Sequence, residues 1–189
     1  GDGPAPDAGD LLAGHDGALP EHESALVLER YGVPFAARRR AATPEEAAAA
    51  AAELGFPVVV KVDGVAHKAR EGGVVLGVGS AAEAAEAARR LGGPVLVARQ
   101  ADPGVEALCG MTRDPDYGPV LVVGRGGVDV EDLAQVVTTV APIDAETASE
   151  LVAEAGIDDP SGTVAATLAA LGRLALAHPE IVSIDVNPL

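Results

Sequence analysis

The sequence is poor in large and reactive side chains. Its 189 residues include one cysteine, one methionine, no tryptophan and only 2% aromatic residues. The single cysteine, Cys109, excludes an internal disulfide and any metal site built from several cysteines. The scarcity of aromatics excludes a core built around large rings and argues against stacking platforms for nucleic-acid bases. Cys109 lies in an apolar run, so we interpret it as a small buried hydrophobe rather than a nucleophile.

Basic residues and long apolar runs are also scarce. The 13 lysines and arginines face 29 acidic residues, which gives a formal net charge of -16. Such a charge repels phosphate backbones and anionic lipid surfaces, so we expect neither nucleic acid nor membrane as a partner. An acidic, alanine-rich composition is also common in proteins where it has no functional meaning. No apolar stretch has the length of a membrane span and the N-terminus lacks a signal pattern, so we expect a soluble, cytoplasmic protein.

Helical and extended patterns alternate along the chain after an irregular start. Residues 1–20 are rich in Gly, Pro and Asp without periodicity and predict a flexible tail or linker. The patterns predict helices over 21–32, 44–54, 80–92, 144–155 and 163–177. They predict strands over 57–62, 74–78, 94–100, 105–112, 120–124 and 136–142, with a last strand within 180–189. This alternation indicates an α/β or α+β architecture.

A lysine and a histidine in consecutive segments are candidates for phosphate chemistry. Lys61 follows an apolar run, where a lysine is costly unless an anion such as a phosphate, a nearby carboxylate or water receives its charge. His67 lies beside Lys68 in a loop that continues to a pair of glycines. A neutral imidazole can attack phosphorus and carry a phosphoryl group, although a lone loop histidine is ordinarily a surface residue.

Two further patterns are typical of phosphate and cation sites. The loop Gly124-Arg125-Gly126-Gly127 follows an apolar strand and can offer backbone N–H groups to phosphate oxygens, but it is neither a P-loop nor a dinucleotide fingerprint. Asp185 and Asn187 alternate on the last predicted strand, which places their oxygens on one face as Mg²⁺ ligation requires. An Asx turn before Pro188 is the alternative interpretation of this pair.

Five segments in the same order resemble the ATP-grasp subunit of the ADP-forming acyl-CoA synthetases, which include ADP-forming acetate–CoA ligases. The resemblance covers residues 21–189 and is carried by ESALVLERYGVPF, TPEEAAAAAAELGFPVVVKV, HKAREGGV, GVEALCGMTRDPDYGPVLVVGRGG and IDVNPL. The β-subunit of succinyl-CoA synthetase is a more distant match. The resemblance implies an ATP-grasp fold with two lobes, 21–98 and 99–189, each with a mixed sheet and packed helices.

The resemblance also implies a reaction and the residues that perform it. In this family a phosphohistidine on a mobile segment transfers a phosphoryl group to the nucleotide while acid, CoA and ATP interconvert with acyl-CoA, ADP and phosphate. His67 matches the phosphorylated histidine of that family. Lys61 matches the strand lysine that contacts the nucleotide phosphates, and Glu106 matches the acidic residue of the G-x-E stretch.

The remaining matches concern the metal, the phosphates and the partner. Gly126 and Gly127 match the glycine loop near the phosphates, Asn187 matches the metal-binding asparagine and Asp185 its acidic neighbour. The implied cofactors are ATP/ADP and Mg²⁺. The implied partner is a CoA-binding ligase domain or an alpha subunit. We expect His67, Lys61 and Asn187 to face one cavity.

Several positions depart from the family pattern and leave two hypotheses open. The span from Lys61 to His67 is about two residues short, and Gln135 and Thr139 stand where the family has an acidic residue and an arginine. An arginine-glycine pair is missing around Ser161-Gly162, and a further aspartate is expected beyond Leu189. The first hypothesis is a catalytic fragment that works with a CoA-binding partner. The second is a degenerate regulatory or ligand-sensing module fused to a protein lysine acetyltransferase.

Overall fold

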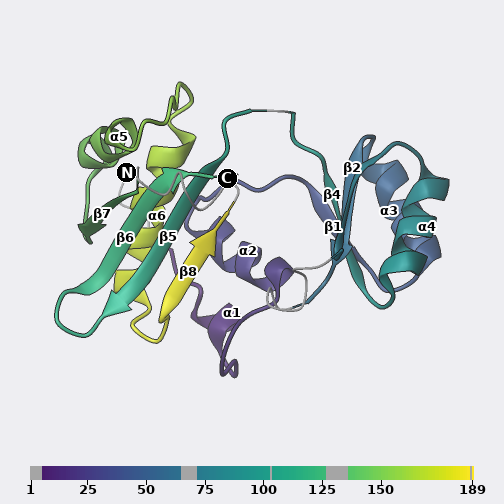
Figure 1. The fold of residues 1–189 in the computed structure, drawn as a ribbon. Coiled ribbons are helices and arrows are strands. Elements are labelled where there is room, and N and C mark those ends of the chain that lie inside the picture. Colours follow the sequence, from purple (N-terminus) through teal and green to yellow (C-terminus); the bar gives the residue numbers. More distant parts are fainter. Residues whose placement is uncertain (1–5, 65–71, 103, 127–135, 188) are drawn as a thin grey trace. The chain divides into compact units, whose positions relative to one another are not determined.

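The computed structural model of this chain describes residues 6–64, 72–102, 104–126, 136–187 and 189. Its described residues form two compact units, each built on one four-stranded sheet. The sheet-A unit takes residues from Leu11–Leu26 and Phe35–Asp102, and the sheet-B unit takes residues from Gly1–Asp10, Val27–Pro34 and Pro103–Leu189. Figure 1 shows the elements of both units with their labels.

The sheet-A unit packs two helices against one face of an antiparallel sheet. Its strand order is β1-β4-β2-β3. The strands and helices are β1 (Arg38–Ala41), β2 (Val58–Val62), β3 (Val74–Val78), β4 (Val95–Arg99), α3 (Pro44–Leu54) and α4 (Ala81–Leu91). Because the core between them consists of alanines and valines, α3 and α4 can lie close together and close to the sheet.

Both helices of this unit begin with a capping box. The Thr43 hydroxyl accepts the Glu46 N–H at 3.2 Å, and the Ser80 hydroxyl accepts the Glu83 N–H at the same distance. Each glutamate reaches back to a backbone N–H just before the helix, at Ala42 and at Gly79. Donors that the first helical turn leaves without partners are thereby satisfied.

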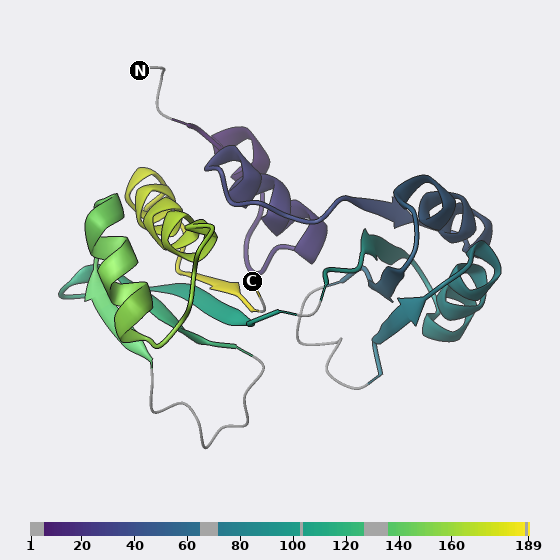
Figure 2. The same ribbon diagram turned by 90° about the horizontal axis from the view of Figure 1, so that it is seen from above.

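The sheet-B unit repeats the two-layer arrangement with longer strands. Its strand order is β7-β6-β5-β8, again antiparallel at every described pairing. Its elements are β5 (Ala107–Asp114), β6 (Gly118–Arg125), β7 (Val137–Val140), β8 (Ser183–Val186), α5 (Ala145–Glu154) and α6 (Thr163–Ala177). Figure 2 shows α5 and α6 on the same side of these strands. The opposite face of sheet B is therefore left for other contacts.

The buried face of sheet B is set by alternate side chains on its two central strands. Cys109 and Met111 on β5 and Leu121 and Val123 on β6 are each at most 2% exposed, and they face the apolar side of α6. The predicted burial of Cys109 is confirmed. Arg113 fixes the far end of α6, since its guanidinium donates to the carbonyls of Ala175, His178 and Ile181. Ala175 lies in the last turn of the helix, where carbonyls lack intrahelical donors, and the other two acceptors follow that turn.

Two N-terminal helices precede the first strand. They are α1 (Gly9–Leu12) and α2 (Glu21–Arg30), and the boundary between the two units falls inside α2. In the sheet-B unit Arg30 binds both carboxylate oxygens of Asp10, at 3.2 and 3.1 Å. The buried His178 ring packs edge-on against Tyr31, and its Nε2 atom accepts the N–H of Ala8 at 3.4 Å. These contacts attach the segment around Ala8 to the end of α6.

The predicted α/β class is confirmed, and most predicted elements differ from the observed bounds by one to three residues. Within the described residues, no helix is long and apolar enough to cross a membrane.

Candidate functional site

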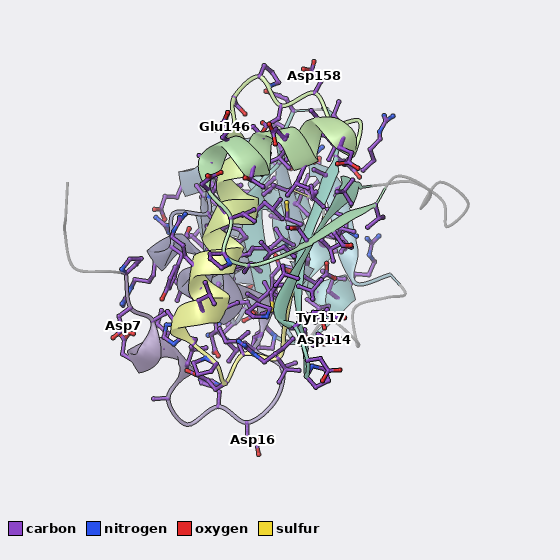
Figure 3. The ribbon with its side chains drawn as sticks, turned by 90° about the vertical axis from the view of Figure 1, so that its left-hand side faces the viewer. Asp7, Asp16, Asp114, Tyr117, Glu146 and Asp158 are labelled. Carbon is purple, nitrogen blue, oxygen red and sulfur yellow. The ribbon has the colours of Figure 1, made fainter. Side chains whose placement is uncertain are left out.

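One end of sheet B brings together three of the predicted site residues. Glu106 immediately precedes β5, Gly126 immediately follows β6, and Asn187 immediately follows β8. Because both β6 and β8 run antiparallel to β5, the ends of β6 and β8 lie beside the start of β5. The N–H of Gly126 donates to the carbonyl of Glu106 at 2.8 Å. Figure 3 labels Asp114 and Tyr117, which mark the turn at the other end of the β5–β6 hairpin.

The position of Gly126 leaves little room for a side chain. A Cβ atom at this position would lie 3.1 Å from both the carbonyl carbon and oxygen of Ala107 and 3.2 Å from Oδ1 of Asn187. These distances are shorter than ordinary van der Waals contact, so a larger residue would need its neighbours to move. The glycine therefore allows the asparagine amide to approach the backbone at the end of β6 closely.

The backbone beyond β8 is held in place next to this glycine. Ala107 and Leu189 exchange two hydrogen bonds, with N–H to O distances of 2.8 and 3.3 Å. Asn187 lies between this pair and the end of β8, so its backbone position is fixed on both sides. These bonds fix the backbone from which the Asn187 side chain projects.

Asp185 and Asn187 provide oxygen donors on one face of sheet B. Asp185 pairs with Gly110 in the register, on the face opposite to the buried Cys109 and Val186 pair. Both side chains are exposed. No group of three or more His, Cys, Asp or Glu that could hold a metal occurs among the described residues. The donor set nevertheless fits Mg²⁺, which prefers oxygen ligands and completes its octahedron with water and substrate phosphates.

Lys61 belongs to the sheet-A unit and lies on its second face, away from α3 and α4. Its register neighbours are Leu96 on β4 and Val74 on β3, whereas Val58 and Val60 point into the core. Its Nζ atom forms an ion pair with Oε1 of Glu21 at the start of α2. The structure therefore gives Lys61 a carboxylate partner, one of the three possibilities that the sequence left open.

Glu21 and a second ion pair in this unit were not identified from the sequence. Arg40 precedes the end of β1 and contacts Asp63 at 2.5 Å, and the Asp63 side chain is fully buried. Arg40, Leu96 and Lys61 are register partners in one row across the sheet. No local sequence signal predicts these pairs, because each joins residues far apart in the chain that only the fold of the unit brings together.

The other predicted positions fall into two groups. His67, Gly127 and Gln135 lie outside the described residues. Thr139 is half-buried on β7 opposite Leu121, and Gly162 caps α6 with a positive φ of 70°. Ser161 bonds Asp159 and Thr163 beside that cap, so these residues form a helix start.

Two surface hollows of about 250 Å³ lie away from these residues. One is lined by β3 and α4, around Leu76, Glu86 and Arg90. The other is lined by α5 and the segment before α6, around Ile157 and Asp159. None of the predicted site residues lines either hollow. The candidate site is therefore defined by the strand ends and not by a concave pocket within one unit.

Comparison with known proteins identifies a family for nearly the whole chain. Residues 10–189 match the model of the ATP-grasp domain. The chain is 36% identical over 197 residues to acetate–CoA ligase (ADP-forming) I subunit beta of Pyrococcus furiosus, covering 90% of this chain and 84% of that protein. It is 35% identical over 196 residues to acetate–CoA ligase (ADP-forming) I of Archaeoglobus fulgidus, covering 88% of this chain but only 28% of that longer protein.

Solved structures of one archaeal enzyme share the fold. Dinucleotide forming acetyl-coenzyme A synthetase 1 of Ca. Korarchaeum cryptofilum, in complex with coenzyme A, Ca-AMPCP and HgCl⁺, matches with a TM-score of 0.80 at 33% identity, over 90% of this chain and 85% of that one. Its selenomethionine derivative with coenzyme A and Mg-AMPPCP matches with a TM-score of 0.75 at 33% identity, over 90% of this chain and 84% of that one. The chain therefore belongs to the ATP-grasp domain family, as a homologue of the ADP-forming acetate–CoA ligases.

Proposed function

We propose that this chain is the nucleotide-binding module of an ADP-forming acyl-CoA synthetase and that it transfers a phosphoryl group between a phosphohistidine and ADP/ATP. The convergence of Glu106, Gly126 and Asn187 at one end of sheet B is the observation that carries this proposal. It combines exposed oxygen donors with a closely packed backbone segment at Gly126. Such an arrangement suits a nucleotide phosphate with its metal ion.

The site residues have complementary roles in this proposal. Phosphoryl transfer depends mainly on positioning and charge neutralisation. Asp185 and Asn187 hold Mg²⁺, which supplies neutralisation of phosphate charge when bound. Gly126 lets the backbone come close to the phosphates, although its own N–H donates to the Glu106 carbonyl. The donors to phosphate oxygens in this proposal lie in the loop that continues to Gly127, outside the described residues. Glu106 lies beside Gly126. From the family resemblance we assign the positive charge of Lys61, in the sheet-A unit, to the nucleotide phosphates.

We propose His67 as the phosphoryl carrier on the strength of the family resemblance. An imidazole nitrogen forms a bond to the γ-phosphorus of ATP while the bond from that phosphorus to the β,γ-bridging oxygen breaks and releases ADP. The reverse step regenerates ATP. The Korarchaeum synthetase with Mg-AMPPCP has a phosphohistidine segment pointing towards its nucleotide binding site, which supports the same chemistry here.

The partner in this proposal supplies the acyl and CoA chemistry. The Pyrococcus relative is named a beta subunit, and the Archaeoglobus relative is a much longer single chain. Both support a CoA-binding ligase domain or alpha subunit that works with this module. We accordingly expect this chain alone not to convert acid, CoA and ATP into acyl-CoA.

The nucleotide and metal roles are tested by isothermal titration calorimetry of the chain with ATP, in Mg²⁺ and in EDTA. ATP binds more tightly in Mg²⁺, and Asn187→Ala removes most of that advantage because an oxygen ligand is lost. Ser183→Ala is the matched control, since Ser183 is an exposed residue on the same strand and face. The absence of ATP binding at millimolar concentration contradicts the proposal and favours the regulatory-module hypothesis.

The phosphoryl carrier is tested by incubating the chain with ATP and Mg²⁺ and mapping phosphate by mass spectrometry under alkaline conditions. An acid-labile phosphate on His67, absent from His67→Ala, is the expected result. His22→Ala serves as the control for histidine removal elsewhere. A chain that binds Mg-ATP without becoming phosphorylated at His67 refutes the carrier role and leaves nucleotide binding intact.

A further inference from the structure

The ion pair between Glu21 and Lys61 places a carboxylate beside the lysine that we assign to nucleotide phosphates. Glu21 is the first residue of α2, where a negative charge interacts favourably with the helix dipole. The Lys61 side chain is 27% exposed and the Glu21 side chain 47%, so solvent reaches both partners. Phosphate oxygens that approach Lys61 therefore also approach a carboxylate.

The neighbouring cation in the same row also has a carboxylate partner. Arg40 lies across Leu96 from Lys61, and its own side chain is 50% exposed, but its partner Asp63 has a side chain with no exposed area. An anion that displaced Asp63 from Arg40 would leave a buried carboxylate without compensation, which is costly. In the Glu21–Lys61 pair neither carboxylate nor ammonium is fully buried, so an anion can compete for Lys61 without that cost.

We propose that Glu21 is a specificity-determining residue, which makes the nucleotide site favour metal-complexed ATP over free ATP. This inference rests on the function proposed above. Coulomb repulsion between Glu21 and the phosphates scales with the phosphate charge, and Mg²⁺ cancels about two of those negative charges. The carboxylate therefore weakens binding of free ATP more than binding of Mg-ATP. Specificity arises here as a difference between two affinities, through a repulsive group.

The test compares Glu21→Gln with Glu23→Gln by calorimetric titration of ATP in Mg²⁺ and in EDTA. Both variants remove one negative charge from the first turn of α2, but Glu23 lies 3.7 Å from His15 and is not the partner of Lys61. In Glu21→Gln the dissociation constant for free ATP falls about 2- to 5-fold, as expected for an exposed charge contact, and that for Mg-ATP falls less. The preference for Mg-ATP is therefore reduced, whereas Glu23→Gln retains it.

Salt provides a second measurement on the same proteins. Raising NaCl from about 50 to 300 mM shortens the screening length, so the difference between wild type and Glu21→Gln shrinks. Thermal unfolding of each variant verifies that it is folded, and Glu21→Ser replaces Glu21→Gln if the latter is not.

Three results overturn the inference. The first is an unchanged preference for Mg-ATP in Glu21→Gln. The second is weaker binding of both ATP forms by Glu21→Gln, which indicates that Glu21 only positions Lys61. The third is an equal loss of the preference for Mg-ATP in Glu23→Gln. Any of these, with ATP still bound, leaves the proposed function standing. Failure of wild type and Glu21→Gln to bind ATP in either form removes the proposed function and the inference together.

Discussion

The Asn187 side-chain oxygen lies so close to Gly126 that any Cβ atom there would stand 3.2 Å from it. This contact joins the ends of β6 and β8 on either side of β5. It makes glycine the residue that fits the candidate site without displacing its neighbours, and it links backbone geometry to the placement of a proposed metal ligand.

Gly126→Ala should destabilise the sheet-B unit by about 1–3 kcal/mol, because the added methyl group meets the rigid Ala107 backbone as well as Asn187. Urea unfolding measures the change. Gly64→Ala is the control, since a Cβ there meets nothing closer than a Val62 methyl group at 3.9 Å and φ is not positive. That substitution should leave stability unchanged or raise it by up to about 1 kcal/mol. Equal losses in both variants would contradict the steric account.

Arg113→Leu should lower the unfolding free energy by about 1–3 kcal/mol. The guanidinium donates to three carbonyls in and after the last turn of α6, at 2.7 Å to Ala175, 3.1 Å to Ile181 and 3.3 Å to His178, and leucine leaves them without these donors. Chemical denaturation is the measurement. Arg89→Leu, which removes an exposed arginine paired with Glu86, should cost less than about 1 kcal/mol. A comparable loss in Arg89→Leu would show that arginine removal itself, and not these carbonyls, is responsible.

The N-cap of α5 should produce a measurable pH dependence. The N–H of Thr147 donates to the Asp144 carboxylate at 2.8 Å and lowers the pKa of that carboxyl below its ordinary value of 3.8. A folded-state pKa below the unfolded value stabilises the fold above the unfolded pKa, and this stabilisation is lost as pH falls through the folded pKa. Asp144→Asn retains an acceptor for the cap without titrating, so its melting temperature should fall less than that of wild type between about pH 5 and 2.

Asp144→Ala serves as the second arm of that experiment. It removes the cap acceptor and should melt below Asp144→Asn at neutral pH. Identical pH profiles for wild type and Asp144→Asn would show that this carboxylate does not contribute to acid unfolding.

Cys109 should be unreactive in the folded protein. Its side chain is fully buried, and burial raises the pKa of the thiol to about 12, with a smaller contribution from Asp159. The thiolate is the reactive form, so modification by a disulfide reagent at pH 8 should be slower than in the urea-unfolded chain by at least about 100-fold. Absorbance of the released thiol measures both rates. Rapid modification under native conditions would show that β5 opens locally.

Short-range signals in the sequence specify the local elements and the residue types at the site. Thr43 with Glu46 and Ser80 with Glu83 specify helix starts through bonds within one turn, and the apolar run around Cys109 indicates a buried strand. Such signals act between near neighbours, so they can be read without knowing the fold. The family resemblance assigns roles to Lys61, Glu106, Gly126 and Asn187, and these roles stay predictions.

Which of these residues come into contact depends on the tertiary structure. Glu106, Gly126 and Asn187 come together because β5 pairs with both β6 and β8. Lys61 forms an ion pair with Glu21 because the start of α2 lies near the second face of sheet A. Strand order and the packing of a helix on a sheet arise from burial of apolar surface over the whole unit, a non-directional force that no short motif encodes. Short segments of the sequence thus supply the residue types of the candidate site, while the folded chain sets their geometry.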